Sequence, residues 1–372
     1  MHYKASLFIL ITVAFLFTLA EISLRKLLGY SSSSKNFISE KSLLESNDAV
    51  IYDSLLSWRH KPSIISENGL NTDKNGFRIS RKFTNHDLLN KKIFVSGDSF
   101  AAGAEVKDHE TWPFNLEKLT RYNVINSAVG GWDSFQIIQN VIKNYKVVKP
   151  DIVIVQFTDA IERSKYNIYS SAYKTSYKIE NNSLKLINYP VKKFRKNEFL
   201  NSNNSSIYDK FANSKLCNSL LGGCIFPVKL IFNHSLFLYK AQKKLFNPPY
   251  GLNFDKVYVK DEYLNLEKNC MLMNELSTTL NKENIRLITI IQHKGDTIYQ
   301  SKKQSPNLIK FEKCITKSGI EVLNLYTLLK NKFEADEIEF KKLFNIKKNK
   351  YFGHMSSYGN LYISEIIKDE FF

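Results

Sequence analysis

The sequence has few cysteines and lacks the common metal and nucleotide motifs. Its 372 residues include four cysteines, too few for a disulfide-dense miniprotein: Cys217, Cys224, Cys270 and Cys314. Their spacing lacks the short pairs and neighbouring histidines of a zinc site. No Walker loop, dinucleotide fingerprint or H-E-x-x-H motif occurs. We therefore expect neither a metal ion nor a cofactor. The even number is compatible with two disulfides in an oxidising compartment, for example Cys217 with Cys224, or with four unpaired thiols.

Acidic residues are outnumbered by basic ones. The chain has 53 Lys and Arg against 36 Asp and Glu, a net charge of +17. Such a surface favours acidic partners such as phospholipid head groups, acidic glycans or nucleic acid. The lysines are spread along the chain and no basic run stands out, so we expect no nucleic-acid partner. With 43% hydrophobic and 24% charged residues, the chain can bury a core, which excludes a disordered or collagen-like protein.

An uncharged, mostly apolar stretch runs from Ala5 to Ala20, directly after Lys4. About twenty residues at roughly 1.5 Å each span a bilayer core of about 30 Å. Thr18 and Ala20 resemble a signal-peptide cleavage site, but their neighbours are too apolar for the polar region of such a site. We therefore favour an uncleaved membrane anchor over residues 1–27. Residues 28–90 are interpreted as a serine-rich linker and a pre-domain segment.

From residue 91 onward, short apolar runs alternate with amphipathic segments. We expect strands at 93–96, 123–126 and 151–156, and helices at 110–119 and 133–147. The order strand, helix, strand, helix, strand predicts an α/β fold with a central parallel sheet over residues 91–372. An insertion at about 163–262 is rich in Tyr, Asn, Ser and Lys and has no clear period. After it we expect a helix at 262–281, strands at 285–291 and 320–325, and a terminal helix at 355–368.

The segment Gly97-Asp98-Ser99-Phe100 directly follows the expected strand at 93–96. A serine at a strand-to-helix turn has its hydroxyl at the carboxyl edge of a parallel sheet, where ligands collect in doubly wound folds. Near the other end of the chain, His354 lies just before the last helix. If both residues lie at the same edge, His354 takes the serine proton and returns it to the leaving group. Ser99 and His354 are therefore the candidate catalytic pair.

Several segments in order resemble the SGNH (GDSL-type) hydrolases, in particular a membrane-anchored bacterial branch. The matching segments are 20–25 (AEISLR), 58–62 (WRHKP), 71–78 (NTDKNGFR), 94–103 (FVSGDSFAAG), 111–113 (TWP), 126–132 (NSAVGGW), 150–157 (PDIVIVQF) and 354–359 (HMSSYG). The resemblance implies a three-layer α/β/α fold, with Ser99 as nucleophile and His354 as base. It also implies a bacterial inner-membrane protein with one N-terminal helix and an extracytoplasmic body.

The family's first block of site residues corresponds to 94–103, its second to 126–132, and its third follows 150–157. The second and third blocks depart from the family pattern at the positions that hold the oxyanion. The glycine of the second block corresponds to Ala128, whose backbone N–H can still donate. The third block lacks its asparagine; Thr158 can donate instead, whereas an ionised Asp159 cannot. We expect the oxyanion hole to consist of Ser99, Ala128 and Thr158. Loss of one donor typically costs about 2.7–4 kcal/mol of transition-state stabilisation.

A third departure concerns the histidine. The family's aspartate shortly before it is absent, and Tyr351 and Phe352 stand in its place. A dyad can work more slowly without this acid, or with another orienting group such as a backbone carbonyl.

Further residues are expected to line the pocket: Asp98, Gly130, Trp132, Asp159 and His293. His293 follows the expected strand at 285–291, although a structural role is favoured for it. Trp132 can stack on a sugar ring, although core packing is the favoured role.

The resemblance implies acyl-ester chemistry on an acylated glycan or a small ester. The favoured hypothesis is a serine esterase that removes acyl groups, in particular O-acetyl groups, from cell-envelope glycans. The first alternative is an O-acyltransferase that uses the same serine and histidine. The second is a catalytically degenerate glycan-binding or assembly factor, which the missing asparagine and aspartate motivate.

Overall fold

The computed structural model describes part of the chain. The described residues are 12, 16, 48–66, 69–79, 89–158, 160–164, 166–169, 172–192, 256–258, 262–300, 303–346 and 352–372. The chain divides into two compact units, of which the larger comprises 47–167, 173–192 and 258–372 and contains the central sheet. Among the described residues, no helix is both long and apolar enough to cross a bilayer. The predicted anchor at 1–27 lies outside them, apart from Thr12 and Leu16.

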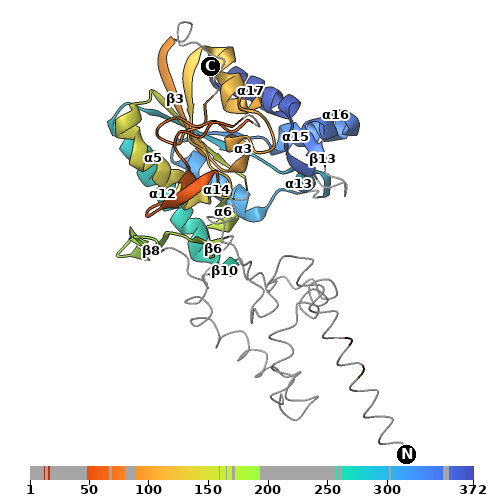
Figure 1. Cartoon of the computed structure of the whole chain (residues 1–372). Helices are drawn as coiled ribbons and strands as arrows, with labels where there is room; N and C mark the ends of the chain where they lie inside the picture. The colour runs from red at the N-terminus through yellow and green to blue at the C-terminus, as the bar shows by residue number, and fades with distance from the viewer. Residues whose placement is uncertain are drawn as a thin grey trace, which may run out of the picture. The chain divides into compact units, whose positions relative to one another are not determined.

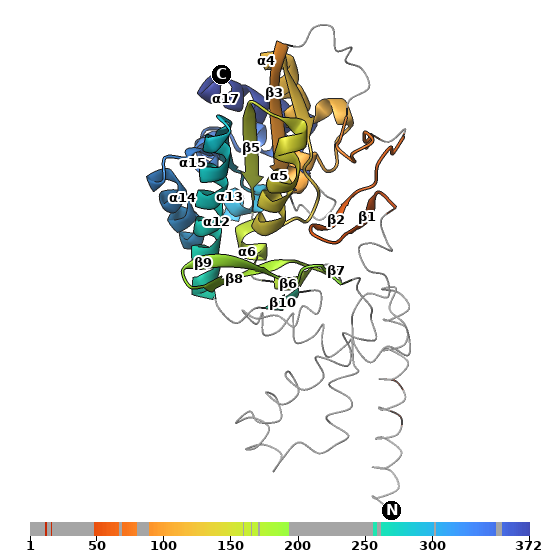
Figure 2. The ribbon, with the colours of Figure 1, turned by 90° about the vertical axis from the view of Figure 1, so that its left-hand side faces the viewer.

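Five parallel strands form the central sheet, in the order β12-β11-β5-β3-β4. Their bounds are Leu89–Gly97 for β3, Tyr122–Asn126 for β4, Ile152–Phe157 for β5, Arg286–Ile291 for β11 and Glu321–Asn324 for β12. The predicted α/β fold with a central parallel sheet is therefore confirmed (Figure 2). Every residue of β5 is buried, as its unbroken apolar run requires of a central strand.

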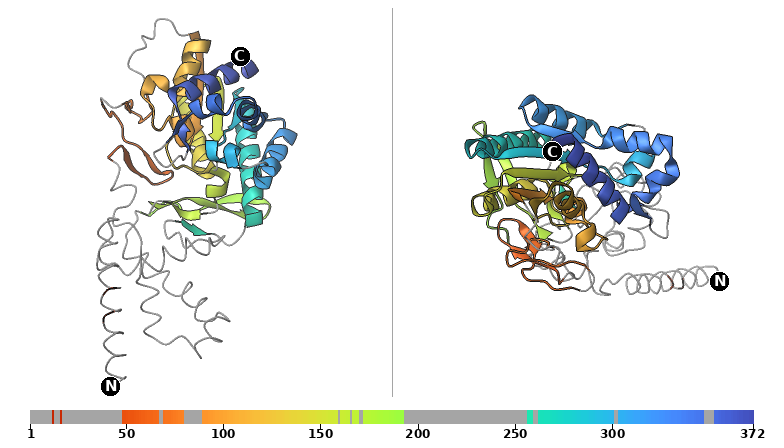
Figure 3. Two further views of the ribbon diagram at one scale, coloured as in Figure 1. Left: turned by 90° about the vertical axis from the view of Figure 1, so that its right-hand side faces the viewer. Right: turned by 90° about the horizontal axis from the view of Figure 1, so that it is seen from above.

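Helices cover both faces of this sheet (Figures 1 and 3). One layer consists of α5 (Ser134–Val148), α12 (Glu262–Lys282) and α14 (Pro306–Lys317). The other consists of α4 (Trp112–Thr120), α13 (Gly295–Gln300), α15 (Tyr326–Ala335), α16 (Glu337–Lys342) and α17 (Ser357–Phe371). A disulfide joins Cys270 to Cys314 and so links α12 to α14. Cys217 and Cys224 lie outside the described residues.

The segment before the sheet packs on the loop that follows β4. Strands β1 (Val50–Asp53) and β2 (Ser57–His60) form an antiparallel hairpin. The Trp58 indole is fully buried and donates to the Gly130 carbonyl at 3.0 Å, while the Trp132 indole donates to the Trp58 carbonyl at 2.9 Å. Trp132 is therefore a core residue with its polar end satisfied, the role that the sequence favoured for it.

The predicted insertion contains regular structure in its described part. Strands β8 (Ser176–Glu180) and β9 (Ser183–Ile187) form a hairpin that packs on α12. Asn181 and Asn182 form its two-residue turn with φ of 50° and 56°, a conformation that asparagine tolerates better than most residues. Strands β6 (Tyr166–Tyr169), β7 (Ala172–Tyr173) and β10 (Lys256–Tyr258) form a separate sheet of order β10-β6-β7.

The segment before the terminal helix is a strand, which the sequence did not predict. Strand β14 (Phe352–Met355) pairs antiparallel with β13 (Phe344–Ile346), so His354 lies on a strand. The terminal helix α17 starts at Ser357 because the Ser356 hydroxyl caps it, accepting the Gly359 N–H at 3.0 Å.

Gly359 in the first turn of α17 leaves no room for a side chain. A Cβ placed on it would lie 2.0 Å from the Leu343 carbonyl oxygen. An alanine normally stabilises a helix by about 1 kcal/mol relative to glycine. We expect Gly359→Ala to do the opposite and to lower the free energy of unfolding by about 1–3 kcal/mol, because overpacking forces the backbone apart. Chemical denaturation of the full chain measures this.

The control for this prediction is Gly319→Ala. Gly319 has φ of 77°, and a Cβ there would meet no described atom within 4 Å. Its substitution therefore carries backbone strain without a clash, about 1–2 kcal/mol. A Gly359→Ala protein as stable as wild type, or more stable, would contradict the close packing of α17 on Leu343.

Candidate active site

The serine turn lies at the carboxyl end of β3. Helix α3 (Ser99–Ala102) starts there, and the Asp98 carboxylate caps it by accepting the Phe100 N–H at 3.0 Å. A Cβ on Gly97 would lie 2.6 Å from the Ala101 Cβ and 2.7 Å from Gln156 Oε1. The glycine is therefore needed because the helix turns back directly onto the strand. This turn places Ser99 at the carboxyl edge of the sheet, as the sequence predicted.

His354 reaches the same edge from β14. Its Nε2 lies 2.9 Å from Ser99 Oγ, a hydrogen-bonding distance between residues 255 positions apart. The Phe100 ring packs beside the imidazole at a centroid distance of 5.1 Å. The His354 side chain is 28% exposed, so a substrate can approach the pair from solvent. The structure thus brings together the two residues that the sequence singled out.

A third residue, Glu105, contacts the histidine from the loop after α3. Glu105 Oε1 lies 3.2 Å from His354 Nδ1, and Oε2 accepts the His354 backbone N–H at 3.1 Å. The Nδ1–Oε1 contact is close, but the N–H direction is not aligned for a hydrogen bond. The sequence analysis missed Glu105, because no spacing rule connects a loop acid near residue 99 with a histidine near residue 354.

The two candidate backbone donors of the second block differ in their surroundings. Ala128 is fully buried and its N–H donates to Asn126 Oδ1 at 3.2 Å. Gly130 lies beside the serine: a Cβ on Gly130 would lie 3.7 Å from the Ser99 Cβ and would meet no other described atom within 4 Å. The sequence placed the donor at Ala128, whose N–H already has an acceptor in the same loop, whereas Gly130 lies within van der Waals range of Ser99.

The third block contributes a glutamine and a threonine near the serine turn. Gln156 is paired in register with Gly97, and its side chain accepts the Ala101 N–H at 3.2 Å. Its amide donates to Thr158 Oγ1 at 3.0 Å, so this hydroxyl keeps its own proton for another acceptor. Thr158 follows the end of β5 at the edge that carries Ser99. Asp159 lies outside the described residues.

Two buried ion pairs lie beneath the serine turn. The Arg163 guanidinium contacts Asp98 at 2.6 Å and donates to the Trp132 carbonyl at 2.7 Å. Lys174 pairs with Asp133, and neither side chain has any exposed surface. Lys174 also donates to the Arg163 carbonyl at 2.9 Å. The network connects the turn that carries Ser99 with the second block. Of its charges, only Asp98 was expected at the site.

His293 is a core residue in the structure. It is 3% exposed, its Nε2 lies 2.9 Å from Asn324 Oδ1, and its ring packs edge-on against Tyr326. Burial lowers the pKa of His293 to about 4. The structure therefore supports the structural role rather than the pocket role. Among the described residues, no group of acids, histidines and cysteines is arranged to hold a metal ion.

Comparison with known proteins finds similarity only among solved structures. No family model and no curated protein matches the chain. An acetyl xylan esterase shares 10% identity, with 76% of this chain and 100% of that chain covered and a TM-score of 0.40. A lipase/acylhydrolase from Enterococcus faecalis shares 12%, with 75% and 94% covered and a TM-score of 0.39. A lipolytic protein of the G-D-S-L family from Veillonella parvula shares 13%, with 76% and 98% covered and a TM-score of 0.34.

Removing Arg163 should destabilise the protein strongly. Arg163→Met leaves the fully buried Asp98 carboxylate without its cation, and we expect a loss of about 3–5 kcal/mol in the free energy of unfolding. Adding Asp98→Asn should recover part of this loss, because the remaining side chain is then neutral. The control Lys341→Met removes an exposed ion pair with Glu337 and should change stability little. Denaturant titration measures the free energy of unfolding of each variant. Equal losses in Arg163→Met and Lys341→Met would contradict the burial of the Arg163–Asp98 pair.

The buried His293 predicts a fall in stability with acid. Its pKa is about 4 when folded and 6.5 in its ordinary state, so between these values the unfolded chain binds more protons. Stability should therefore decrease as the pH falls from 6.5 to 4, by up to about 3 kcal/mol from this group. His293→Gln should flatten this decrease, measured by denaturant titration at each pH. Burial also lowers the pKa of His60 to about 4. His60 therefore contributes equally to the pH dependence of stability in the wild type and in His293→Gln. Parallel pH curves for the two proteins would contradict a buried neutral His293.

Proposed function

We propose that the protein is an SGNH-type serine esterase that acts on acyl esters of cell-envelope glycans. The observation that carries the proposal is the 2.9 Å contact between Ser99 Oγ and His354 Nε2 at the carboxyl edge of a parallel sheet. A serine hydroxyl is a weak nucleophile unless a base takes its proton, and a neutral imidazole at this distance can do so.

The reaction follows from this geometry. Ser99 Oγ attacks the ester carbonyl carbon while its proton moves to His354 Nε2, which forms a tetrahedral oxyanion. The C–O bond to the alcohol then breaks, and His354 returns the proton to the leaving oxygen. Water attacks the resulting acyl-enzyme in the same way, with His354 as base. The carboxylic acid leaves and Ser99 regains its proton.

Backbone groups around Ser99 are suited to the oxyanion. Ser99 begins α3, so its N–H has no carbonyl partner one turn earlier within that helix. Gly130 lies directly beside Ser99, and a Cβ on it would be 3.7 Å from the Ser99 Cβ. We assign these two N–H groups as oxyanion donors, with the Thr158 hydroxyl as a third. This set replaces the family asparagine with a weaker donor, so we expect a slower enzyme than one that has it.

The proposed substrate and compartment rest on the chain outside the site. The apolar stretch from Ala5 to Ala20 suits a single-pass anchor in a bacterial inner membrane. The Cys270–Cys314 disulfide supports an oxidising, extracytoplasmic compartment for the body. The net charge of +17 suits acidic envelope polymers. O-acetyl groups on such glycans are therefore the proposed substrate.

Substitution of either catalytic residue should abolish ester hydrolysis. We expect Ser99→Ala and His354→Gln each to lower kcat/KM on p-nitrophenyl acetate by at least about 10³-fold. The double variant should be no worse than either single variant, because the two side chains act as a unit. Ser183→Ala, at the exposed start of β9, is the control and should keep full activity. Equal activity in Ser99→Ala and wild type would sink the proposal.

The same acyl-enzyme also distinguishes hydrolysis from transfer. Purified full-length protein incubated with acetylated envelope polysaccharide should release acetate, which mass spectrometry of the polysaccharide records as lost acetyl groups. With p-nitrophenyl acetate added as acyl donor, gain of acetyl groups on the polysaccharide, with feeble hydrolysis, would identify an acyltransferase. No Ser99-dependent change in either direction would identify a binding or assembly factor.

A further inference from the structure

We propose that Glu105 is the acid that positions His354, in place of the aspartate that the segment before the histidine lacks. This inference rests on the proposed function, because it assigns a role within the same Ser99–His354 reaction. Glu105 does not touch the substrate in this account. It acts through His354 by fixing the orientation, tautomer and charge of the imidazole.

The contact between the two residues has two points. Glu105 Oε2 accepts the backbone N–H of His354 at 3.1 Å, which ties β14 to the loop after the serine turn. Glu105 Oε1 lies 3.2 Å from Nδ1, on the side of the ring opposite Ser99. Nδ1 is enclosed by protein and has no aligned acceptor among the described residues. A small rotation of the carboxylate supplies one, and such tightening is common when a substrate binds.

The backbone at Glu105 is itself unusual. Its φ of 72° lies in the left-handed region, where a residue with a Cβ is disfavoured. Glycine or asparagine is the ordinary choice at such a position. Residues held in this conformation against their preference gather at functional sites. The glutamate therefore occupies a position where local backbone preference alone favours another residue, and its contacts to His354 give a reason for it.

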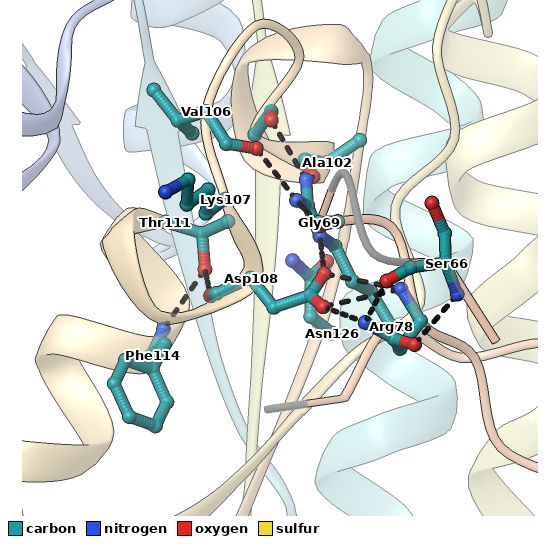
Figure 4. Close-up of polar contacts among 12 residues, drawn as sticks. Ser66, Gly69, Arg78, Ala102, Val106, Lys107, Asp108, Thr111, Phe114 and Asn126 are labelled. Atoms are coloured by element: carbon teal, nitrogen blue, oxygen red, sulfur yellow. Dashed lines mark hydrogen bonds and ion pairs between the residues drawn. The ribbon is translucent and has the colours of Figure 1, made fainter. Parts of the chain in front are cut away.

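A buried arginine holds this loop on both sides of Glu105. Arg78 donates to the carbonyl of Gly103 at 2.7 Å and to that of Val106 at 2.8 Å. Asp108 fixes the Arg78 side chain through a 2.6 Å contact to its Nε, and Figure 4 shows the guanidinium among the loop carbonyls. Arg78 therefore holds the loop on both sides of Glu105, and the Ala104 N–H adds a hydrogen bond to the Ser99 carbonyl at 2.9 Å. The carboxylate is in place before a substrate arrives.

An acid at this position assists the reaction in two ways. An anion beside Nδ1 favours the tautomer with the proton on Nδ1, which leaves the Nε2 lone pair free to accept the Ser99 proton. When His354 takes that proton it becomes an imidazolium, and the Glu105 carboxylate stabilises the positive charge without receiving a proton itself. Without it, a proton on Nε2 points at Ser99 Oγ and blocks deprotonation.

The local charges make this effect measurable. Glu105 is the charged side chain paired with the ring among the described residues. Asp98, the acid next to Ser99, is already paired with Arg163 at 2.6 Å. Removal of the Glu105 charge should therefore move the proton of the neutral ring from Nδ1 towards Nε2, because the anion beside Nδ1 favours the proton there.

The test compares Glu105→Gln, Glu105→Asp and a matched control in the full-length chain. Glu105→Gln should lower kcat on p-nitrophenyl acetate by about 10²–10⁴-fold. Its His354 ring 15N chemical shifts should report a proton moved from Nδ1 towards Nε2. Glu105→Asp should restore part of kcat and of the Nδ1 tautomer. Glu110→Gln removes the same charge from a nearby carboxylate that contacts the Lys107 N–H, and it should leave both kcat and the tautomer unchanged. A merely structural role for Glu105 predicts lost stability without a changed tautomer.

A second measurement keeps the inference separate from the esterase proposal. In the Ser99→Ala background, 15N NMR of the His354 ring compares Glu105 with Glu105→Gln and does not depend on turnover. A shift of the neutral ring from the Nδ1–H to the Nε2–H tautomer in Glu105→Gln supports the inference even if no ester is hydrolysed. An unchanged tautomer, or an unchanged kcat in an active Glu105→Gln enzyme, overturns it. Activity that does not need Ser99 overturns the proposed function instead.

Discussion

The short contact between Ser99 and His354 constrains the rest of the structure, because it joins residues 255 positions apart at a hydrogen-bonding distance. Ser99 is fixed by a parallel strand, a glycine that permits a tight turn, and an aspartate that caps the following helix. His354 is fixed by a short antiparallel strand whose partner, β13, precedes it in the chain. A shift of about 1 Å in either support breaks the geometry that proton transfer requires. The three-layer packing therefore serves the site as well as stability.

The buried carboxylates near the serine turn are each neutralised by a buried cation next to them. Asp98 and Asp133 are both completely buried, and each has its own cation, Arg163 and Lys174 respectively. Buried pairs of this kind add little net stability, but one partner without the other is costly. Their value here is geometric, since Arg163 also binds the Trp132 carbonyl and Lys174 binds the Arg163 carbonyl. Together they hold the first and second blocks in one arrangement.

The loop after the serine turn is also held by a buried cation, Arg78. Arg78 comes from the segment that precedes the sheet, yet it organises the carbonyls of the loop that carries Glu105. Trp58, from the same segment, is buried against the Gly130 carbonyl on the other side of Ser99. Residues 48–79 thus support both the acid side and the oxyanion side of the candidate site.

The sequence by itself determined the parallel sheet, the serine turn and the identity of the two catalytic candidates, because periodicity and turn residues are local signals. The sequence did not predict strand β14, because its four residues include a glycine and a histidine and show no clear period. Only the tertiary structure showed that the Ala128 N–H already has an acceptor and that Gly130 lies beside Ser99, because both depend on the path of the loop after β4. Only the tertiary structure brought Glu105 to His354. Side chains meet through packing, and the distance along the chain does not reveal which loop acid packing brings to which histidine.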